Sequence, residues 1–339
     1  MDDPVSIAAQ GVVSEGGPGE GGAKKVLLLK PRGFCAGVVR AIDVVQMALE
    51  AFGAPIYVRR EIVHNRHVVR ELAGKGAVFV HEVDEVPFGQ RVIYSAHGVS
   101  PAVRETSRQR GLKVIDATCP LVTKVHLEAV KFSRQGYSLV LIGHRDHDEI
   151  EGTLGEAPAA TQVVSSVEEV AALSVPDPNR VAYLTQTTLS LTEARDIIQA
   201  LKEKFPDIQG PQSQDICYAT ENRQVAVGNV AHQAGLVLVV GSNNSSNSNR
   251  LVEVSRNLGT AGHLIDQASA IDPAWLDGVD TVAVTAGASA PEVLVEDVLE
   301  ALRGRGFTRV EEVEARREDV RFALPKGLQQ EGAGPLALN

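Results

Sequence analysis

The chain has 339 residues, of which 44% are hydrophobic and 22% charged, and its formal net charge is −10 at pH 7. This length favours two or three domains of about 100 to 150 residues. Proteins that follow nucleic-acid phosphates carry clustered Lys and Arg, so the acidic balance argues against nucleic acid as a partner. No apolar run reaches the roughly 18 to 20 residues of a membrane span, so we expect no membrane partner either.

Residues 1–24 are rich in glycine, and we expect them to form a disordered N-terminal arm. They hold four acids against one base, whereas organelle transit peptides are rich in Arg and poor in acids, so we expect a cytoplasmic location. Residues 17–22 match the pattern G-x-G-x-x-G. Because no strand precedes them, we do not interpret them as a dinucleotide-binding loop.

Three cysteines, Cys35, Cys119 and Cys217, lie 84 and 98 residues apart. An odd number at such spacing does not suit a secreted disulfide framework. Free cysteines are often small buried hydrophobes, and this use stays open at this point.

Each cysteine follows an extended segment and precedes a helical pattern. After Cys35, apolar residues recur at helical spacing at positions 38, 42, 45, 49 and 52. The segments LKVIDATCPLVTKV and PQSQDICYATENRQV repeat the arrangement. We therefore expect each cysteine at a helix N-terminus, a position that lowers the pKa of a thiol and favours the metal-binding thiolate.

A second strand follows in each unit, as IYVRR, SLVLIGH and GLVLVVGS, and each ends in a polar loop. In the first two units a histidine follows the cysteine at nearly the same distance, His64 after 29 residues and His147 after 28. In the third unit Ser245, Ser246 and Asn247 occupy this distance. Such agreement indicates three copies of one structural unit.

A third strand recurs as RVIYSAHGVSP, RVAYLTQTTLS and TVAVTAGASAP. The loops after it carry His97, then Gln186 with Thr187 and Thr188, then Ser289. Strands that alternate with helices predict parallel sheets, in which ligands gather beyond the carboxyl ends of the strands. All of these polar loops lie at such ends.

The predicted fold is therefore α/β, with three similar domains built on small, mostly parallel sheets. We place them at residues 25–117, 118–213 and 214–312, arranged with pseudo-threefold symmetry around a central site to which each contributes one cysteine and two polar loops. From its composition, the tail of residues 313–339 is expected to be disordered.

Three converging thiolates leave a metal centre with an incomplete ligand set. Zinc with three cysteines and a water is one candidate, although structural zinc sites usually use closely spaced cysteine pairs. A [4Fe-4S] cluster held by three cysteines is the other candidate, and its fourth iron would be open to a substrate oxygen. The repeat favours the cluster.

Eight motifs carry a resemblance to a known family. KPRGFCAGV, VHNR, SAHGVS, DATCPLV, GHxxHxEIEGT, TQTTLS, GSNNSSNSNRL and TAGASAP occur here in the order found in 4-hydroxy-3-methylbut-2-enyl diphosphate reductases, across residues 26–292. The resemblance implies a reductive loss of the 4-hydroxyl with two electrons and two protons, giving isopentenyl and dimethylallyl diphosphates as the last step of the non-mevalonate isoprenoid pathway. It also implies that Cys35, Cys119 and Cys217 hold one [4Fe-4S] cluster per chain.

An allylic diphosphate substrate needs several donors that converge on its oxygens. Each candidate alone has an ordinary alternative, since loop histidines are usually solvated and NNSSNSN resembles a linker. Their common offset from the cysteines argues against both alternatives. The predicted substrate-binding residues are His64, His97, His147, Thr187, Ser245, Ser246, Asn247 and Ser289.

Glu149 and Thr187 are the predicted catalytic pair. Glu149 can give a proton to the leaving hydroxyl, because enclosure beside an anionic substrate would raise its pKa. Thr187 can orient the hydroxyl or a water beside it. Arg145, Asp146 and Asp148 stand where small residues and proline are common in the family, which adds charge close to Glu149.

Two other functions remain open from the sequence. One is a non-redox lyase whose three-cysteine cluster only polarises a hydroxyl, and the other is a zinc-stabilised or metal-free module that binds phosphorylated metabolites. For the reductase, no Rossmann or flavin motif is found, so we expect an external electron donor such as a ferredoxin or flavodoxin.

Overall fold

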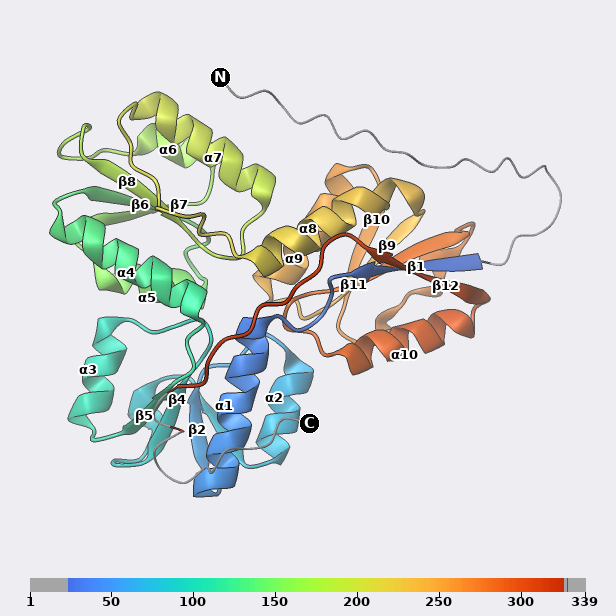
Figure 1. Ribbon diagram of the computed structural model, residues 1–339, viewed down its shortest axis with the longest axis horizontal. Helices are drawn as coiled ribbons and strands as arrows, with labels where there is room; N and C mark the ends of the chain where they lie inside the picture. Colours follow the sequence, from blue (N-terminus) through green and yellow to red (C-terminus); the bar gives the residue numbers. More distant parts are fainter. Residues whose placement is uncertain (1–23, 326–327, 329–339) are drawn as a thin grey trace.

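The computed structural model describes residues 24–325 and residue 328. Three lobes surround a common centre, and each has its own parallel sheet with helices packed beside it (Figure 1). This confirms the predicted α/β fold with three small sheets. The expected N-terminal arm lies outside the described residues except for Lys24, which begins a strand. Among the described residues, no helix combines the length and the apolar character needed to cross a membrane.

The first lobe has a four-stranded sheet in the order β3-β2-β4-β5. The predicted apolar face of its first helix is buried, with Val45 fully so and Val38 and Ile42 nearly so. This face packs into the core of the lobe. Its elements are α1 (Ala36–Phe52), β2 (Ile56–Arg59), α2 (Arg66–Gly74), β3 (Ala77–Val80), the 3-10 helix η1 (Val83–Glu85), β4 (Arg91–Tyr94), α3 (Pro101–Gln109) and β5 (Lys113–Asp116).

The second lobe has a three-stranded sheet in the order β7-β6-β8. Its central strand is apolar and almost entirely buried, as expected for a parallel strand covered on both faces. Its elements are α4 (Pro120–Arg134), β6 (Ser138–Ile142), α5 (Asp148–Glu156), β7 (Thr161–Val164), α6 (Val167–Ala172), β8 (Val181–Thr185) and α7 (Leu191–Lys204).

The third lobe has a five-stranded sheet in the order β10-β9-β11-β1-β12. From α8 to β12 its described helical segments, three 3-10 helices included, alternate with its strands as predicted. They are β1 (Lys24–Lys30), α8 (Tyr218–Val230), η2 (Ala231–Gln233), β9 (Leu236–Val240), α9 (Ser246–Asn257), β10 (Ala261–Ile265), η3 (Ala268–Ala270), η4 (Pro273–Leu276), β11 (Thr281–Ala286), α10 (Glu292–Arg303) and β12 (Phe307–Glu314).

Strand β1 differs from the expected domain boundary. We had placed it in the first domain, residues 25–117, but it pairs with β11 on one side and β12 on the other, in the third lobe. Val26 to Leu29 are all buried, so the strand needs neighbours on both edges and covered faces above and below. Local sequence shows that requirement but not which sheet meets it.

The tail also differs from the expectation of disorder. Strand β12 runs to Glu314, and residues 315–325 then cross from the third lobe to the first (Figure 1, the red chain). Leu324 and Leu328 pack against the core of the first lobe. Residues 326–327 and 329–339 lie outside the described part of the chain. The few apolar residues of this segment stand among charged ones and form no periodic pattern, so the composition did not reveal the packing.

Candidate metal centre and ligand cavity

The three cysteines are the N-cap residues of three helices, one from each repeat. Cys35 precedes α1, Cys119 precedes α4 and Cys217 precedes α8. This confirms the predicted position of each cysteine between an extended segment and a helix. All three thiols are free and line a single cavity.

Gly37 allows two of these thiols to approach each other. A Cβ atom at this position would lie 2.8 Å from Cys119 Sγ and 3.8 Å from Cys35 Sγ. A side chain would therefore displace the Cys119 thiol. The sequence analysis missed this residue, although it stands within the CAG motif.

The expectation that helix N-termini lower the thiol pKa values is wrong for this state of the protein. Burial raises the pKa of Cys119 to about 12 and that of Cys217 to about 11, and the neighbouring thiols add to both shifts. Backbone N–H groups act in the opposite direction, but desolvation outweighs them. A bound metal deprotonates its coordinating thiols outright. These buried thiols are therefore better suited to act as metal ligands than to exist as free thiolates.

Three histidines meet at the side of the cavity formed by the first two lobes. The His64 and His97 rings stack with centroids 4.0 Å apart, and the His147 ring stands edge-on to them at 5.4 and 5.8 Å. They come from the loops after β2, β4 and β6, so the carboxyl ends of the strands supply them as predicted.

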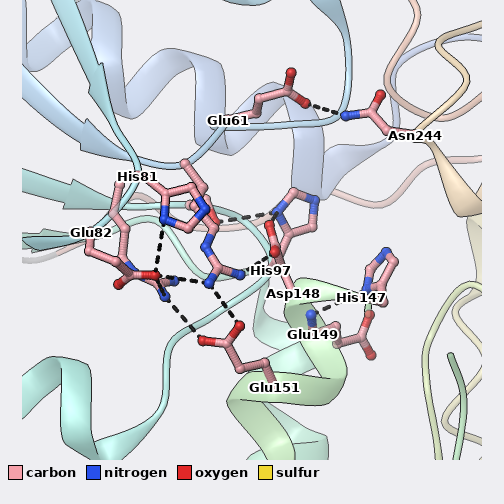
Figure 2. A network of polar contacts seen from close by, with 12 residues as sticks. Glu61, His81, Glu82, His97, His147, Asp148, Glu149, Glu151 and Asn244 are labelled. Atoms are coloured by element: carbon pink, nitrogen blue, oxygen red, sulfur yellow. Dashed lines mark hydrogen bonds and ion pairs between the residues drawn. The ribbon is translucent and has the colours of Figure 1, made fainter. Parts of the chain in front are cut away.

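Two of the histidines are neutral at pH 7. Burial, followed by the field of His64, lowers the pKa of His97 well below its ordinary value and that of His147 to about 4, although Asp148 opposes the shift of His147. His147 Nδ1 accepts a hydrogen bond from the backbone N–H of Glu149, at 3.2 Å (Figure 2). The ring proton of neutral His147 therefore resides on Nε2, which can donate to an anion.

The third lobe contributes the N-terminus of α9. Ser245 is its N-cap, and Ser246 and Asn247 form its first turn, where backbone N–H groups and the helix dipole favour anions. Asn247 is only 4% exposed, and neither atom of its side-chain amide has a hydrogen-bond partner within the described residues. Buried amides are normally paired, so this residue is prepared for a ligand. Ser289 joins the same wall and donates to the His64 carbonyl at 2.9 Å.

Glu149, in the first turn of α5, and Thr187, in the loop after β8, form a buried pair in the second lobe. Thr187 donates its backbone N–H to one carboxylate oxygen at 2.7 Å and its hydroxyl to the other at 2.9 Å. Burial raises the pKa of Glu149 to about 7, although these two hydrogen bonds lower it, and the charge of Asp215 adds to the rise. A substantial fraction of Glu149 is therefore protonated at neutral pH, as an acid catalyst requires.

The three charged residues that the sequence places near Glu149 are either paired with other residues or exposed. Asp148 forms an ion pair with Arg60 of the first lobe and lies 3.8 Å from His97 Nδ1 (Figure 2). Asp146 is exposed, and Arg145 reaches Val163 and Glu169 instead. The raised pKa of Glu149 thus comes from burial rather than from these three residues.

Every predicted site residue lines this one cavity: Cys35, Cys119, Cys217, His64, His97, His147, Glu149, Thr187, Ser245, Ser246, Asn247 and Ser289. The predicted roles of these residues remain predictions, which their convergence supports. Besides Gly37, the cavity includes Tyr218 and Phe322, which the sequence analysis did not select. Tyr218 follows Cys217 directly in the sequence, whereas Phe322 lies in the tail, where no motif or periodicity pointed to it.

Three α/β lobes that share one cavity, with a cysteine and polar loops from each repeat, define an enzyme whose candidate site lies at the meeting point of its domains. The family model described as LytB protein matches residues 26–303. The chain is 56% identical to 4-hydroxy-3-methylbut-2-enyl diphosphate reductase of Leifsonia xyli, covering 92% of this chain and 93% of that protein. It is 58% identical to the Bordetella pertussis reductase, covering 90% and 94%.

The E-1-hydroxy-2-methyl-but-2-enyl-4-diphosphate reductase structure of Plasmodium falciparum matches with a TM-score of 0.88 at 40% identity, over 90% of this chain and 97% of that one. The chain therefore belongs to the LytB family, the 4-hydroxy-3-methylbut-2-enyl diphosphate reductases. It is an iron–sulfur oxidoreductase. This confirms the resemblance found in the sequence.

We predict that Gly37→Ala lowers the iron and sulfide content of the purified protein, because the new methyl group displaces the Cys119 thiol. Gly228→Ala is the matched control, since Gly228 also lies within a helix but has open space around its Cα. Both changes favour the helix by about 1 kcal/mol, so neither should unfold it. Full iron content in Gly37→Ala would contradict the close approach of the thiols.

Proposed function

We propose that this chain reduces 4-hydroxy-3-methylbut-2-enyl diphosphate to isopentenyl and dimethylallyl diphosphates, the last step of the non-mevalonate pathway. The observation that carries the proposal is the Glu149–Thr187 pair, a buried acid with a pKa of about 7 in the same cavity as three thiols and a set of anion-binding groups. Neither a lyase nor a binding module is favoured by any feature of this cavity, and the family is one of reductases.

We infer that Cys35, Cys119 and Cys217 hold one [4Fe-4S] cluster. The residues fit it, because the chain has three cysteines and all three thiols meet in the cavity. Three protein ligands leave one coordination position for a ligand that is not protein. When bound, such a cluster supplies electrons and a Lewis-acidic iron.

The diphosphate would be held mainly by neutral donors. His147 Nε2, the unpartnered amide of Asn247 and the N-terminus of α9 can all donate to its oxygens without first losing a charged partner. These donors come from the second and third lobes, and His64 and His97 complete the set from the first. A ligand bound by all of them holds the three lobes together and excludes water from the cavity.

Glu149 delivers the proton that converts the leaving 4-hydroxyl into water. Loss of that hydroxyl requires two electrons and two protons in total. Thr187 fixes the orientation of the Glu149 carboxyl through its two hydrogen bonds, and its hydroxyl can also face the substrate. No dinucleotide or flavin motif is found in the sequence, so we propose that a small external redox protein, a ferredoxin or flavodoxin, supplies the electrons.

The first test of this function replaces each cysteine by serine. Each variant should lose iron, sulfide and activity to a similar extent, because each lobe offers one thiolate and a serine hydroxyl is a far weaker ligand. A cysteine variant with full iron and turnover would remove that residue from the centre.

The second test is Glu149→Gln, which keeps the size of the side chain and removes its proton. Iron content and substrate affinity should stay near normal, while turnover with a chemical reductant should fall about 100- to 10,000-fold, the usual contribution of a positioned acid. Asp146→Asn removes a nearby exposed carboxyl and should leave turnover unchanged. Near-normal turnover in Glu149→Gln would refute the acid assignment.

The pH dependence of kcat/KM tests the same residue by another route. This quantity reports the free enzyme, in which the pKa of Glu149 is about 7. Since the protonated carboxyl is the active form, kcat/KM should be level below that pH and fall above it. The lowered pKa values of His97 and His147 keep both rings neutral throughout this range. The decline should be absent from the residual activity of Glu149→Gln, and its persistence there would assign it to another group.

A further inference from the structure

Two buried arginines connect the cysteine-bearing segments to the tail. Arg40 lies on α1, five residues after Cys35, and is 9% exposed. It donates to the carbonyl of Thr118, the residue before Cys119, at 3.0 Å. Its Nε donates to the carbonyl of Ala323 at 2.7 Å.

The second arginine repeats this pattern on another helix. Arg223 lies on α8, six residues after Cys217, and its side chain is completely buried. Its Nη2 donates to the carbonyl of Gly33, two residues before Cys35, at 2.7 Å. Its Nη1 pairs with Glu318 at 3.0 Å, and Glu318 also accepts from Asn222 at 3.0 Å.

The two arginines therefore meet the same stretch of chain, residues 315–325, which we name the C-terminal strap. Through Arg40 it contacts the segments of Cys35 and Cys119, and through Arg223 it contacts those of Cys217 and Cys35. Between these two attachment points Phe322 lines the cavity that holds the thiols. Leu324 then anchors the strap in the core of the first lobe.

We propose that the C-terminal strap is a positioning element for the metal centre. It fixes the three cysteine segments relative to one another and covers the cluster with Phe322. The inference rests on the proposed cluster. Groups outside the ligand shell fix the direction of metal ligands, and their loss commonly weakens metal binding. Here the fixed groups are the backbone carbonyls beside Cys35 and Cys119, and the strap supplies the counter-charge and the acceptors that keep both guanidinium groups in place.

The decisive comparison is between two neighbouring acids of the strap. Glu318→Gln removes the charge that faces Arg223, whereas Asp319→Asn removes the same charge from a side chain that is 77% exposed and pairs with the exposed Arg317. Arg40→Lys is the second test variant. A lysine keeps the positive charge but offers one nitrogen, which cannot serve the carbonyls of both Thr118 and Ala323 in the arrangement of a guanidinium fork.

The full-length protein, purified without oxygen, would be incubated with an iron chelator at 25 °C, and cluster loss followed by absorbance. We expect Glu318→Gln to lose its cluster about 10- to 100-fold faster than the wild type, because loss of such a supporting contact typically lowers metal affinity by that factor. Arg40→Lys should show a smaller acceleration and Asp319→Asn none. Phe322→Ala should admit the chelator faster without changing the unfolding temperature of the apoprotein.

The EPR spectrum of the reduced cluster separates positioning from general stability. A shifted spectrum in Glu318→Gln is expected if its cysteines move, and a purely structural role would leave the spectrum unchanged while lowering the unfolding temperature. Cluster loss at the rate of Asp319→Asn, or an unchanged spectrum in both Glu318→Gln and Arg40→Lys, would overturn the inference. Absence of iron and sulfide from the wild type would overturn the proposed function together with it.

Discussion

The whole architecture depends on bringing three thiols from distant parts of the chain to one point. No lobe has two cysteines, and the three are 84 and 98 residues apart, so the centre exists only when all three lobes are folded and docked. Parallel sheets meet this requirement because the carboxyl ends of their strands share one edge, where helix N-termini and polar loops also gather. Gly37 shows how tight the arrangement is, since even a methyl group there would displace a thiol.

Burial sets the charge state of this centre. It raises the pKa values of Cys119, Cys217 and Glu149 and lowers those of His97 and His147, so each group favours its neutral form. A cavity of neutral donors with an unpartnered amide is poor in charge but rich in hydrogen-bonding capacity. It is therefore suited to a ligand that brings its own negative charge, and to a metal centre that converts the thiols into thiolates.

The repeat in the sequence located the site because the spacing of its residues is a property of the fold. Nearly equal offsets from cysteine to polar loop reflect the same order of helix, strand and loop in each unit, which local patterns reveal, although the three helices have 17, 15 and 13 residues. The partner of β1 was not predictable in this way, since any buried parallel sheet satisfies an apolar strand. The thiol pKa values were also missed, because the helix terminus is visible in the sequence whereas the depth of burial is not. The strap was not predicted for a related reason. The arginines that hold it, Arg40 and Arg223, look like ordinary helix residues in the sequence, which does not show the carbonyls that they reach.

The lobes are held together by two kinds of polar contact with different consequences. Between the first and second lobes, Arg59 and Arg60 pair with Glu151 and Asp148, and some of these acids are partly exposed and open to salt screening (Figure 2). Between the first and third lobes, the strap uses guanidinium groups that are almost fully buried. Breaking a buried charged contact leaves an unpaired charge and is far more costly than separating an exposed pair. The contacts of the half-exposed Glu151 between the first and second lobes are therefore less costly to separate than those of the strap, which keeps Cys35 and Cys217 in fixed relation.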